Sequence, residues 1–549
     1  MVVLQGSYQQ TFEQLGLPLV IIVGSILLYF AVSYYFRQRV SDTADLYVAD
    51  RSIGSIVNGA AMSASWESLA TFMGVVALIV SLQLPFIAMW ANFMLSIPLI
   101  VLLYGQTLRR LGVYTPAKFC QQRYGRSMGM LMALLLVLVM LMYALGQFIG
   151  LAKVANVLFG WPFELSLVVI AVIVVGYIVL GGMFGVSYNA ALQFVIMFTA
   201  AYIPMAFVLN DLGASGWWFP PLGYTSLTDE MVQTFPGFFD LTFGLKWYVA
   251  LFLAMALGPI GMPHMAQRVF TSDSIEGGRR SVLWFVALTG LLFAVMYSVG
   301  FAGVFWANQQ GLDIPQADFD KMIFYINFAF NGDTITGYVV AGALAGALST
   351  VSGHMMAISA TVANDLVDMF DVDVPEDRKT RLGYVTIVGA GLVIALLALN
   401  PPAFLVVSIL WAFSLAAAAI TPVIVLGVWS SRVNRYGAIP ASVVGALVVV
   451  VFSPHVLPGI TFGAGGITSA LGMDAAFVAV PLSIIVLVVG SLLGERVGSI
   501  DDRENQRLVN EIHGYPADGR RRFSSAWPLL VLAALCVPLL VWGLAAWPA

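Results

Sequence analysis

The sequence predicts an all-α polytopic membrane protein, and three observations support this fold class. First, 60% of its 549 residues are hydrophobic and only 10% are charged. Soluble domains average roughly 45–50% apolar and about 25% charged residues, so too few charged side chains are available to cover a soluble surface. Second, the mean hydropathy is +0.91. Third, the chain contains fourteen apolar runs of about 20 residues, the length that crosses a bilayer core.

The fourteen predicted spans are separated by polar loops whose charges predict the orientation. With the N-terminus outside, the loops assigned to the inside carry 22 of the 25 basic residues, as membrane topology favours. The first span is followed by Arg37 and Arg39 and has no basic residue before it, which predicts an uncleaved helix. We therefore expect a multi-pass protein of the cell membrane with both termini outside. The predicted spans are residues 15–36, 53–81, 85–106, 127–157, 162–183, 187–210, 246–269, 281–307, 334–366, 381–400, 402–429, 436–453, 473–494 and 526–547.

The spans group into five regions. The outer loops 211–245 and 308–333 are rich in aromatic residues, glycine and proline, and we expect them to be ordered caps. The inner segment 495–525 is charged, and we expect a mobile linker there. The regions are 1–52 (first helix and inner loop), 53–210 (five helices), 211–245 (outer loop), 246–429 (five helices) and 430–549 (three helices).

Composition also excludes several function classes. A net charge of −4 leaves no basic surface for nucleic acid. Cys120 and Cys536 are far apart in sequence, and the four histidines show no metal-ligand spacing. We find no nucleophile–base pair, phosphate loop or metal cluster and predict that the protein is not an enzyme. The expected partners are the lipid bilayer and a small solute, and the sequence gives no oligomeric state.

Two of the predicted spans contain groups that interrupt an apolar helix. The second span reads Ala61-Met62-Ser63-Ala64-Ser65-Trp66-Glu67-Ser68, and an ionised Glu67 there is costly unless it is paired, wet or protonated. The alternative is a protonated Glu67 in an interhelical hydrogen bond. The seventh span reads Gly258-Pro259-Ile260-Gly261-Met262-Pro263-His264, which should break a helix or at least kink it. We expect His264 to make a structural hydrogen bond.

The positions of the two interruptions predict an internal symmetry. Each lies in the first helix of a five-helix block, and five is odd, so the second block enters the membrane from the opposite side. Such inverted repeats bring two broken helices together at a binding site.

Polar side chains in other spans complete the candidate site. In the ninth span Ser349 and Thr350 are about 100° apart on the helix and can both face one site near the carbonyl of Gly346. Hydroxyl and carbonyl oxygens suit a hard cation, although small residues also serve close helix packing. Tyr143, Gln147 and Trp411 are further candidates for solute contact, or have local partners only. We assign no role to His354.

Several motifs carry a resemblance to a known family. The chain resembles the sodium:solute symporter family, and within it the cation/acetate symporter branch, from about Asp45 to about residue 450. The motifs are Asp45 to Gly54, Asn58-Gly59-Ala60, Thr71-Phe72-Met73-Gly74, Leu108 to Gly112, Tyr114-Thr115, Gly261 to His264 with Arg268-Val269-Phe270, and Ser349 to Leu366.

The resemblance implies a LeuT-type core of ten helices, an inverted repeat of five plus five, with one extra helix before it and three after. It also implies alternating access driven by Na+ as the coupling ion. The implied sodium ligands are the carbonyls of Ala64, Glu67 and Gly346 and the hydroxyls of Ser349 and Thr350. The implied solute positions are Ser65, Trp66, Ser68, Tyr143, Gln147, Gly261 and Trp411.

Two departures from the family pattern keep the solute and the coupling open. Many members have an aspartate at or just before the first break, where this chain has Ser65 and Trp66 followed by Glu67. Many also have an acid at the start of the fifth core helix, where this chain reads Ser187-Tyr188-Asn189-Ala190.

Four hypotheses follow. The first is sodium-coupled symport of acetate or another short monocarboxylate, held by helix N-termini because no Lys or Arg lies mid-span. The others are proton-coupled monocarboxylate symport using Glu67, sodium symport of an amino acid such as proline, and a non-transporting membrane sensor.

Overall fold

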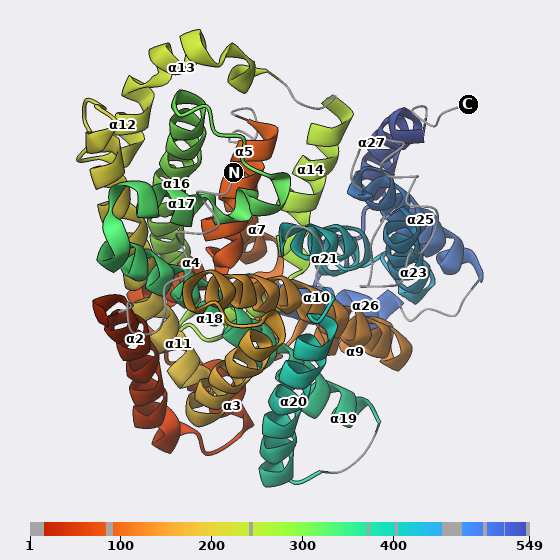
Figure 1. Ribbon diagram of the computed structural model, residues 1–549. Coiled ribbons are helices and arrows are strands. Elements are labelled where there is room, and N and C mark those ends of the chain that lie inside the picture. The colour runs from red at the N-terminus through yellow and green to blue at the C-terminus, as the bar shows by residue number, and fades with distance from the viewer. Residues whose placement is uncertain are drawn as a thin grey trace.

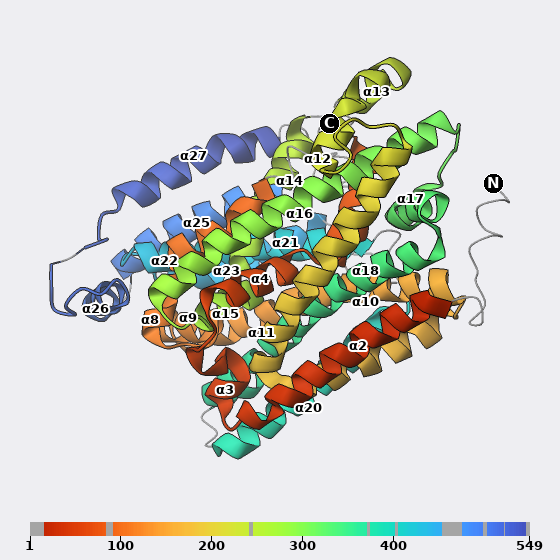
Figure 2. The ribbon, with the colours of Figure 1, turned by 90° about the vertical axis from the view of Figure 1, so that its left-hand side faces the viewer.

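The described chain is a bundle of packed helices (Figures 1 and 2). The computed structural model describes residues 16–83, 92–240, 245–370, 374–400, 405–452, 475–497, 502–520 and 522–544. Within these ranges, nine helices are long and apolar enough to cross a membrane, or up to eleven if each of two bent pairs is one span. A multi-pass, all-helical architecture is therefore confirmed.

The helices of the first half run from the N-terminal helix to a pair of short helices at one end of the molecule. They are α2 Gly16–Phe36, α3 Thr43–Val48, α4 Ser55–Trp66, α5 Val76–Leu82, α7 Ser96–Ile100, α8 Gln106–Leu111, α9 Pro116–Tyr124, α10 Arg126–Phe159, α11 Phe163–Asp211, α12 Pro220–Ser226 and α13 Thr228–Thr234.

The second half contains the second bent pair and the C-terminal helices. Its helices are α14 Leu245–Leu257, α15 Pro263–Phe270, α16 Ile275–Gln309, α17 Met322–Phe330, α18 Gly332–Ser359, α19 Val367–Met369, α20 Glu376–Leu397, α21 Leu405–Ala419, α22 Thr421–Trp429, α23 Arg435–Phe452, α25 Ala476–Val497, α26 Asp502–Ile512 and α27 Trp527–Leu544.

The predicted fourteen spans differ from these helices most clearly at the fifth and sixth spans. The predicted fifth and sixth spans form the 49-residue α11, interrupted at Gly182 by a backbone with φ 52° and ψ −156°. At 1.5 Å per residue α11 is more than twice as long as a bilayer core of about 30 Å, so Gly182 marks a division within it. The predicted third span is helical throughout its described residues 92–106, and the predicted span 436–453 coincides with α23. The fourteen-helix count and the repeat arrangement stay predictions.

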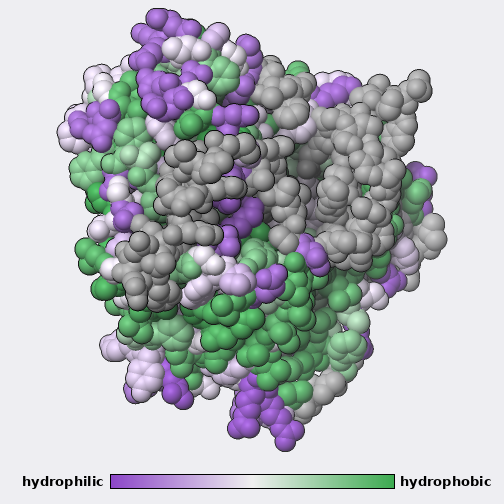
Figure 3. Space-filling view, viewed as in Figure 1, coloured by the Kyte–Doolittle hydropathy of each residue, from purple (hydrophilic) through white to green (hydrophobic). Residues whose placement is uncertain are grey.

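The surface supports a lipid environment. Large apolar side chains are exposed on several helices, with exposed fractions of 63% for Leu27, 71% for Leu283 and 66% for Val385. Figure 3 shows apolar residues over the lower middle of one face, with hydrophilic residues above them and at the lower edge. Exposed apolar area of this extent is typical of a surface that meets another apolar phase.

The two bent pairs lie in the core beside α18 and α21. Helix α4 packs against α11, α16 and α18, and α15 contacts both α4 and α18. Helix α14 packs so closely on α21 that a Cβ atom on Gly258 would lie 2.5 Å from the carbonyl oxygen of Phe413. The absence of a side chain at Gly258 therefore sets the distance between these two helices.

The loops differ from their predictions in one case. The predicted outer cap 211–245 contains the ordered helices α12 and α13 in its described part, which meet α16 and lie at one end of the molecule (Figure 2). The expectation of a mobile linker at 495–525 is wrong for its described residues, because α26 is a packed helix. Asn505 of α26 accepts a hydrogen bond from Arg123.

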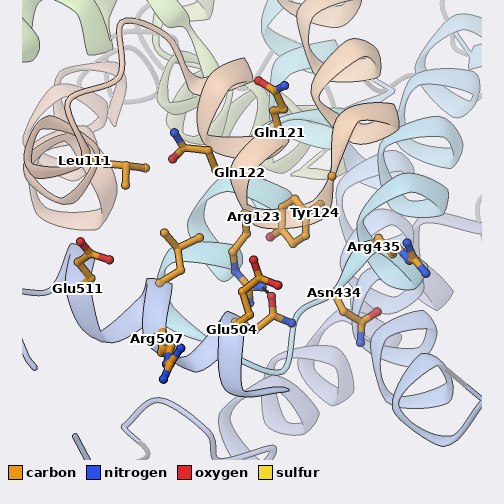
Figure 4. Close-up of a pocket in the computed structure, with 13 residues that line it drawn as sticks. Leu111, Gln121, Gln122, Arg123, Tyr124, Asn434, Arg435, Glu504, Arg507 and Glu511 are labelled. Carbon is orange, nitrogen blue, oxygen red and sulfur yellow. Dashed lines mark hydrogen bonds between the residues drawn. The ribbon is translucent and has the colours of Figure 1, made fainter. Parts of the chain in front are cut away.

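Between α9, the start of α23 and α26 lies a pocket of about 870 Å³. Figure 4 shows the Arg123 side chain of α9 running toward α26, where Glu504 and Arg507 also line the pocket. Burial lowers the pKa of the Arg123 guanidinium. Its charge is surrounded by the carbonyl oxygens of Gly427, Ser430, Ser431 and Val433.

We predict that Gly258→Ala destabilises the protein by about 1–3 kcal/mol, because the new Cβ overlaps the Phe413 backbone and forces the helices apart. Thermal unfolding in detergent with a thiol-reactive dye measures this, since Cys120 and Cys536 are both buried and free. Gly389→Ala on α20 is the matched control, because nothing lies within 4 Å of its added Cβ. Equal unfolding temperatures for the two variants would contradict the prediction.

Candidate functional site

The first interruption separates α4 from the helical segment 70–82. Helix α4 ends at Trp66, Glu67 leaves the helical conformation, and the two segments are bent by 51°. The freed amide of Leu69 donates to Gln147 Oε1 of α10 at 3.0 Å, and the amide of Ala70 donates to Ser68 Oγ at 3.1 Å. Serine side chains that bond to nearby backbone favour such a local exit from the helix.

The second interruption follows Leu257 and ends where Pro263 begins α15, with a bend of 45°. Pro263 occupies the first helical position, where its missing N–H costs nothing. The freed carbonyl of Leu257 accepts from the Thr421 hydroxyl at 2.8 Å, and that of Ile260 accepts from the Tyr104 hydroxyl at 2.5 Å. At each interruption, freed backbone groups therefore bond to side chains of neighbouring helices, as the interior of a membrane protein requires.

The predicted hydroxyl pair of α18 faces the end of α4. Ser349 Oγ lies 2.7 Å from the carbonyl oxygen of Ala64 and 2.9 Å from that of Gly346. Thr350 Oγ1 lies 3.0 Å from the carbonyl oxygens of Ser65 and Gly346. Both hydroxyls are buried, so one helix presents two alcohols to the backbone of another.

The remaining predicted ion ligand, the Glu67 carbonyl, is close to the same helix. Its oxygen lies 3.3 Å from the place where a Cβ on Gly346 would stand. The Ser65 carbonyl is an additional oxygen that the sequence analysis did not include. All these candidate ligand atoms are neutral oxygens, a set that fits a hard monovalent cation better than a transition metal. Among the described residues, no group of three or more His, Cys, Asp or Glu could hold a metal.

The predicted solute residues are only partly brought together. Ser68 Oγ lies 3.5 Å from the Tyr143 hydroxyl, and Gln147 is one turn further along α10, so these three share one side of the first interruption. Trp66 instead packs edge-on against Phe285 of α16, with ring centres 6.1 Å apart.

Gly261 and Trp411 belong to the side formed by α21. A Cβ on Gly261 would lie 3.0 Å from the Ala416 carbonyl oxygen, so Gly261 permits close packing. The indole nitrogen of Trp411 is buried and has no hydrogen-bond partner among the described residues. Its neighbour Phe413 meets the Tyr143 ring with centres 5.4 Å apart.

Glu67 is fully buried, as the sequence predicts for an acid deep in a span. Neither oxygen of its carboxyl group meets the geometry of a hydrogen bond within the described part of the chain, and the Thr71 side chain is the polar group that interacts with it. Because an ionised carboxylate in such surroundings is strongly disfavoured, the side chain is a candidate for proton exchange.

Three functional candidates were missed or misjudged from the sequence. Arg268 lies at the end of the predicted seventh span, yet it is 1% exposed and donates to Ser65 Oγ at 3.0 Å, a burial that the charge pattern of the loops does not predict. His264 was expected to make a structural hydrogen bond, yet its ring nitrogens have no partner in the described residues, and the same holds for His354. The available signal was the spacing of His264 and Arg268 directly after the break, since residues four apart share a helix face.

Two interrupted helices that meet around buried polar groups in a multi-pass bundle define the architecture of secondary transporters. Residues 46–445 of the chain match the model of the sodium:solute symporter family. The chain therefore belongs to the sodium:solute symporter family and is a multi-pass membrane protein.

Two solved structures support a LeuT-like fold. One is a Na+-coupled sialic acid symporter in a substrate-bound outward-open state, with 17% identity, a TM-score of 0.72, and coverage of 88% of this chain and 98% of that one. The other is Mhp1, a nucleobase-cation-symport-1 family transporter in a closed conformation, with 11% identity, a TM-score of 0.50, and coverage of 92% and 95%. At these identities the likeness shows the fold alone.

We predict that Gln147→Leu costs about 1–3 kcal/mol of stability, because the buried Leu69 amide at the first interruption loses its acceptor. Thermal unfolding with the thiol-reactive dye measures it. Gln267→Leu is the control, since the Gln267 side chain is buried and both of its polar atoms lack partners within the described ranges. A loss of stability in the control that equals the loss in Gln147→Leu would contradict the assigned role.

Proposed function

We propose that the protein is a sodium-coupled symporter of a small organic solute, with acetate or another short monocarboxylate as the first candidate. The observation that carries the proposal is the contact of Ser349 and Thr350 with the carbonyls of Ala64, Ser65 and Gly346. Membership of the sodium:solute symporter family supports sodium coupling.

The oxygen set suggests how ion binding would be coupled to movement. Each hydroxyl now donates its proton to backbone carbonyls, and each can turn a lone pair inward when a cation enters. A cation held by Ala64 on α4 and by Ser349 and Thr350 on α18 would fasten the first interrupted helix to α18. Release of the cation would free α4 to move relative to α18, which is the change that alternating access needs.

The interruptions also favour an anionic solute. The helical segment after each break carries partial positive charge at its N-terminus, and at the first break the amides of Leu69 and Ala70 donate to Gln147 and Ser68. Pro263 begins one such segment and Ala70 the other. These partial charges favour an anionic group in the neighbourhood of the interruptions.

A second candidate is proton-coupled symport of a monocarboxylate, which the fully buried Glu67 carboxyl favours. In this alternative Glu67 takes up a proton on one side of the membrane and releases it on the other. The two candidates differ in the gradient that drives uptake.

We predict that the double variant Ser349→Ala, Thr350→Ala lowers sodium-driven uptake by at least about tenfold, because both alcohol ligands of the cation are lost. Proteoliposomes with an imposed sodium gradient and labelled acetate, pyruvate or proline provide the measurement. Thr336→Ala is the control, since Thr336 lies on the same helix and its hydroxyl bonds only within it, to the Gly332 carbonyl at 2.7 Å. Unchanged uptake and unchanged sodium dependence in the double variant would refute the ion site.

We predict that Glu67→Gln keeps sodium-driven uptake within about threefold of the natural protein, because the proposed ion site uses the Glu67 backbone carbonyl and not its side chain. The same variant should remove any uptake driven by a pH gradient in sodium-free vesicles. Strong pH-driven uptake that depends on Glu67, with no effect of sodium, would replace sodium coupling by proton coupling.

A further inference from the structure

Two buried histidines lie face to edge beside the interruptions. The rings of His264 on α15 and His354 on α18 have centres 4.3 Å apart, and the His354 ring lies 4.4 Å from the ring of Tyr143. All four ring nitrogens are buried without a hydrogen-bond partner in the described residues. Buried polar atoms are normally satisfied, so four such atoms in one place indicate a ligand.

Arg268 adds a buried positive charge to the same region. Its two terminal nitrogens donate to the hydroxyls of Ser187 at 2.9 Å and Ser65 at 3.0 Å. None of the ion pairs among the described residues involves Arg268. Neutral hydroxyls do not balance a guanidinium charge, and buried charges in proteins are ordinarily paired.

Ser65 connects the guanidinium with the histidine pair. Its Oγ accepts from Arg268, and it lies 4.0 Å from the point where a Cβ on Gly353 would stand. The same point lies 3.7 Å from the His264 ring carbon Cδ2. Ser65 Oγ is therefore close both to the Arg268 guanidinium and to the side of Gly353 that faces His264, and the Ser65 carbonyl faces Thr350.

The hydrogen-bonding capacity of these groups defines the ligand. Each terminal nitrogen of Arg268 carries two hydrogens, of which the serine bonds use one, and each neutral imidazole offers one further N–H. The unused groups are donors around a positive charge, and a carboxylate accepts several such bonds while neutralising the charge.

We propose that Arg268, His264 and His354 form the subsite that binds the carboxylate of the transported solute. This inference rests on the proposed function and names the group that the solute must carry. It places the anion beside the proposed cation, so that each favours the binding of the other. An uncharged isostere would leave the guanidinium unpaired and is rejected.

The test compares equilibrium binding of acetate and of its neutral isostere acetamide to the purified protein in lipid nanodiscs with sodium present. We expect acetate to bind at least about tenfold more tightly than acetamide. Arg268→Gln should remove this preference because it weakens acetate binding. Its affinity for acetamide should stay within about threefold of that of the natural protein. Arg268→Lys should keep part of the preference, and His354→Gln should lower the affinity for acetate by about three- to tenfold.

The control is His513→Gln, because His513 lies outside the bundle core and its ring contacts the Val428 carbonyl. It should bind acetate as the natural protein does. If Arg268→Gln does not fold, as judged by the thiol-reactive dye, Arg268→Lys and His354→Gln carry the test. Retained preference for acetate in Arg268→Gln, or unchanged acetate affinity in His354→Gln, overturns the subsite.

The outcome for the subsite is separable from the outcome for the proposed function. Sodium-driven uptake of an uncharged solute without preference for acetate would overturn the subsite alone. A preference for acetate that depends on Arg268, without any sodium-driven uptake, would overturn sodium symport and leave the subsite in place.

Discussion

The structure depends on one constraint: backbone amides and carbonyls that leave a helix inside an apolar bundle must find partners there. At the first interruption Gln147 supplies an acceptor, and at the second Tyr104 and Thr421 supply donors. Gln147 belongs to α10, Thr421 to α22, and Tyr104 to the helical turn directly before α8. The interruptions are therefore stable only in the assembled bundle. Broken helices and their surroundings thus form one unit.

The polar groups of the core divide into two sets according to whether they have a hydrogen-bond partner. Groups such as Gln147 Oε1 and the Thr421 hydroxyl are engaged with backbone and hold the interruptions open. Groups such as the His264 and His354 ring nitrogens and the Trp411 indole nitrogen are buried and unengaged among the described residues. The first set builds the frame, and the second set marks where a solute can be recognised.

The sequence predicted the membrane class and the two interruptions, because composition and the placement of proline and glycine are local properties. The approach of Ser349 and Thr350 to α4 was implied by the resemblance to the family. It missed the burial of Arg268, because nothing near that residue shows that Ser65 and Ser187 will close over it. It also misjudged 495–525, since a charged segment looks solvated until Arg123 from another part of the chain provides a partner. These failures concern long-range contacts, which a single sequence does not display.

The contact between Arg123 and α26 limits where the chain can be truncated or fused to a tag. A truncation after α25 would remove Asn505, which accepts a hydrogen bond from Arg123. It would expose the buried Arg123 guanidinium beside the turn between α22 and α23. Purification handles and reporter fusions are therefore safer beyond α27 than within the charged stretch before it. This charged stretch, which lies outside the apolar helices, therefore connects segments that are far apart in the sequence.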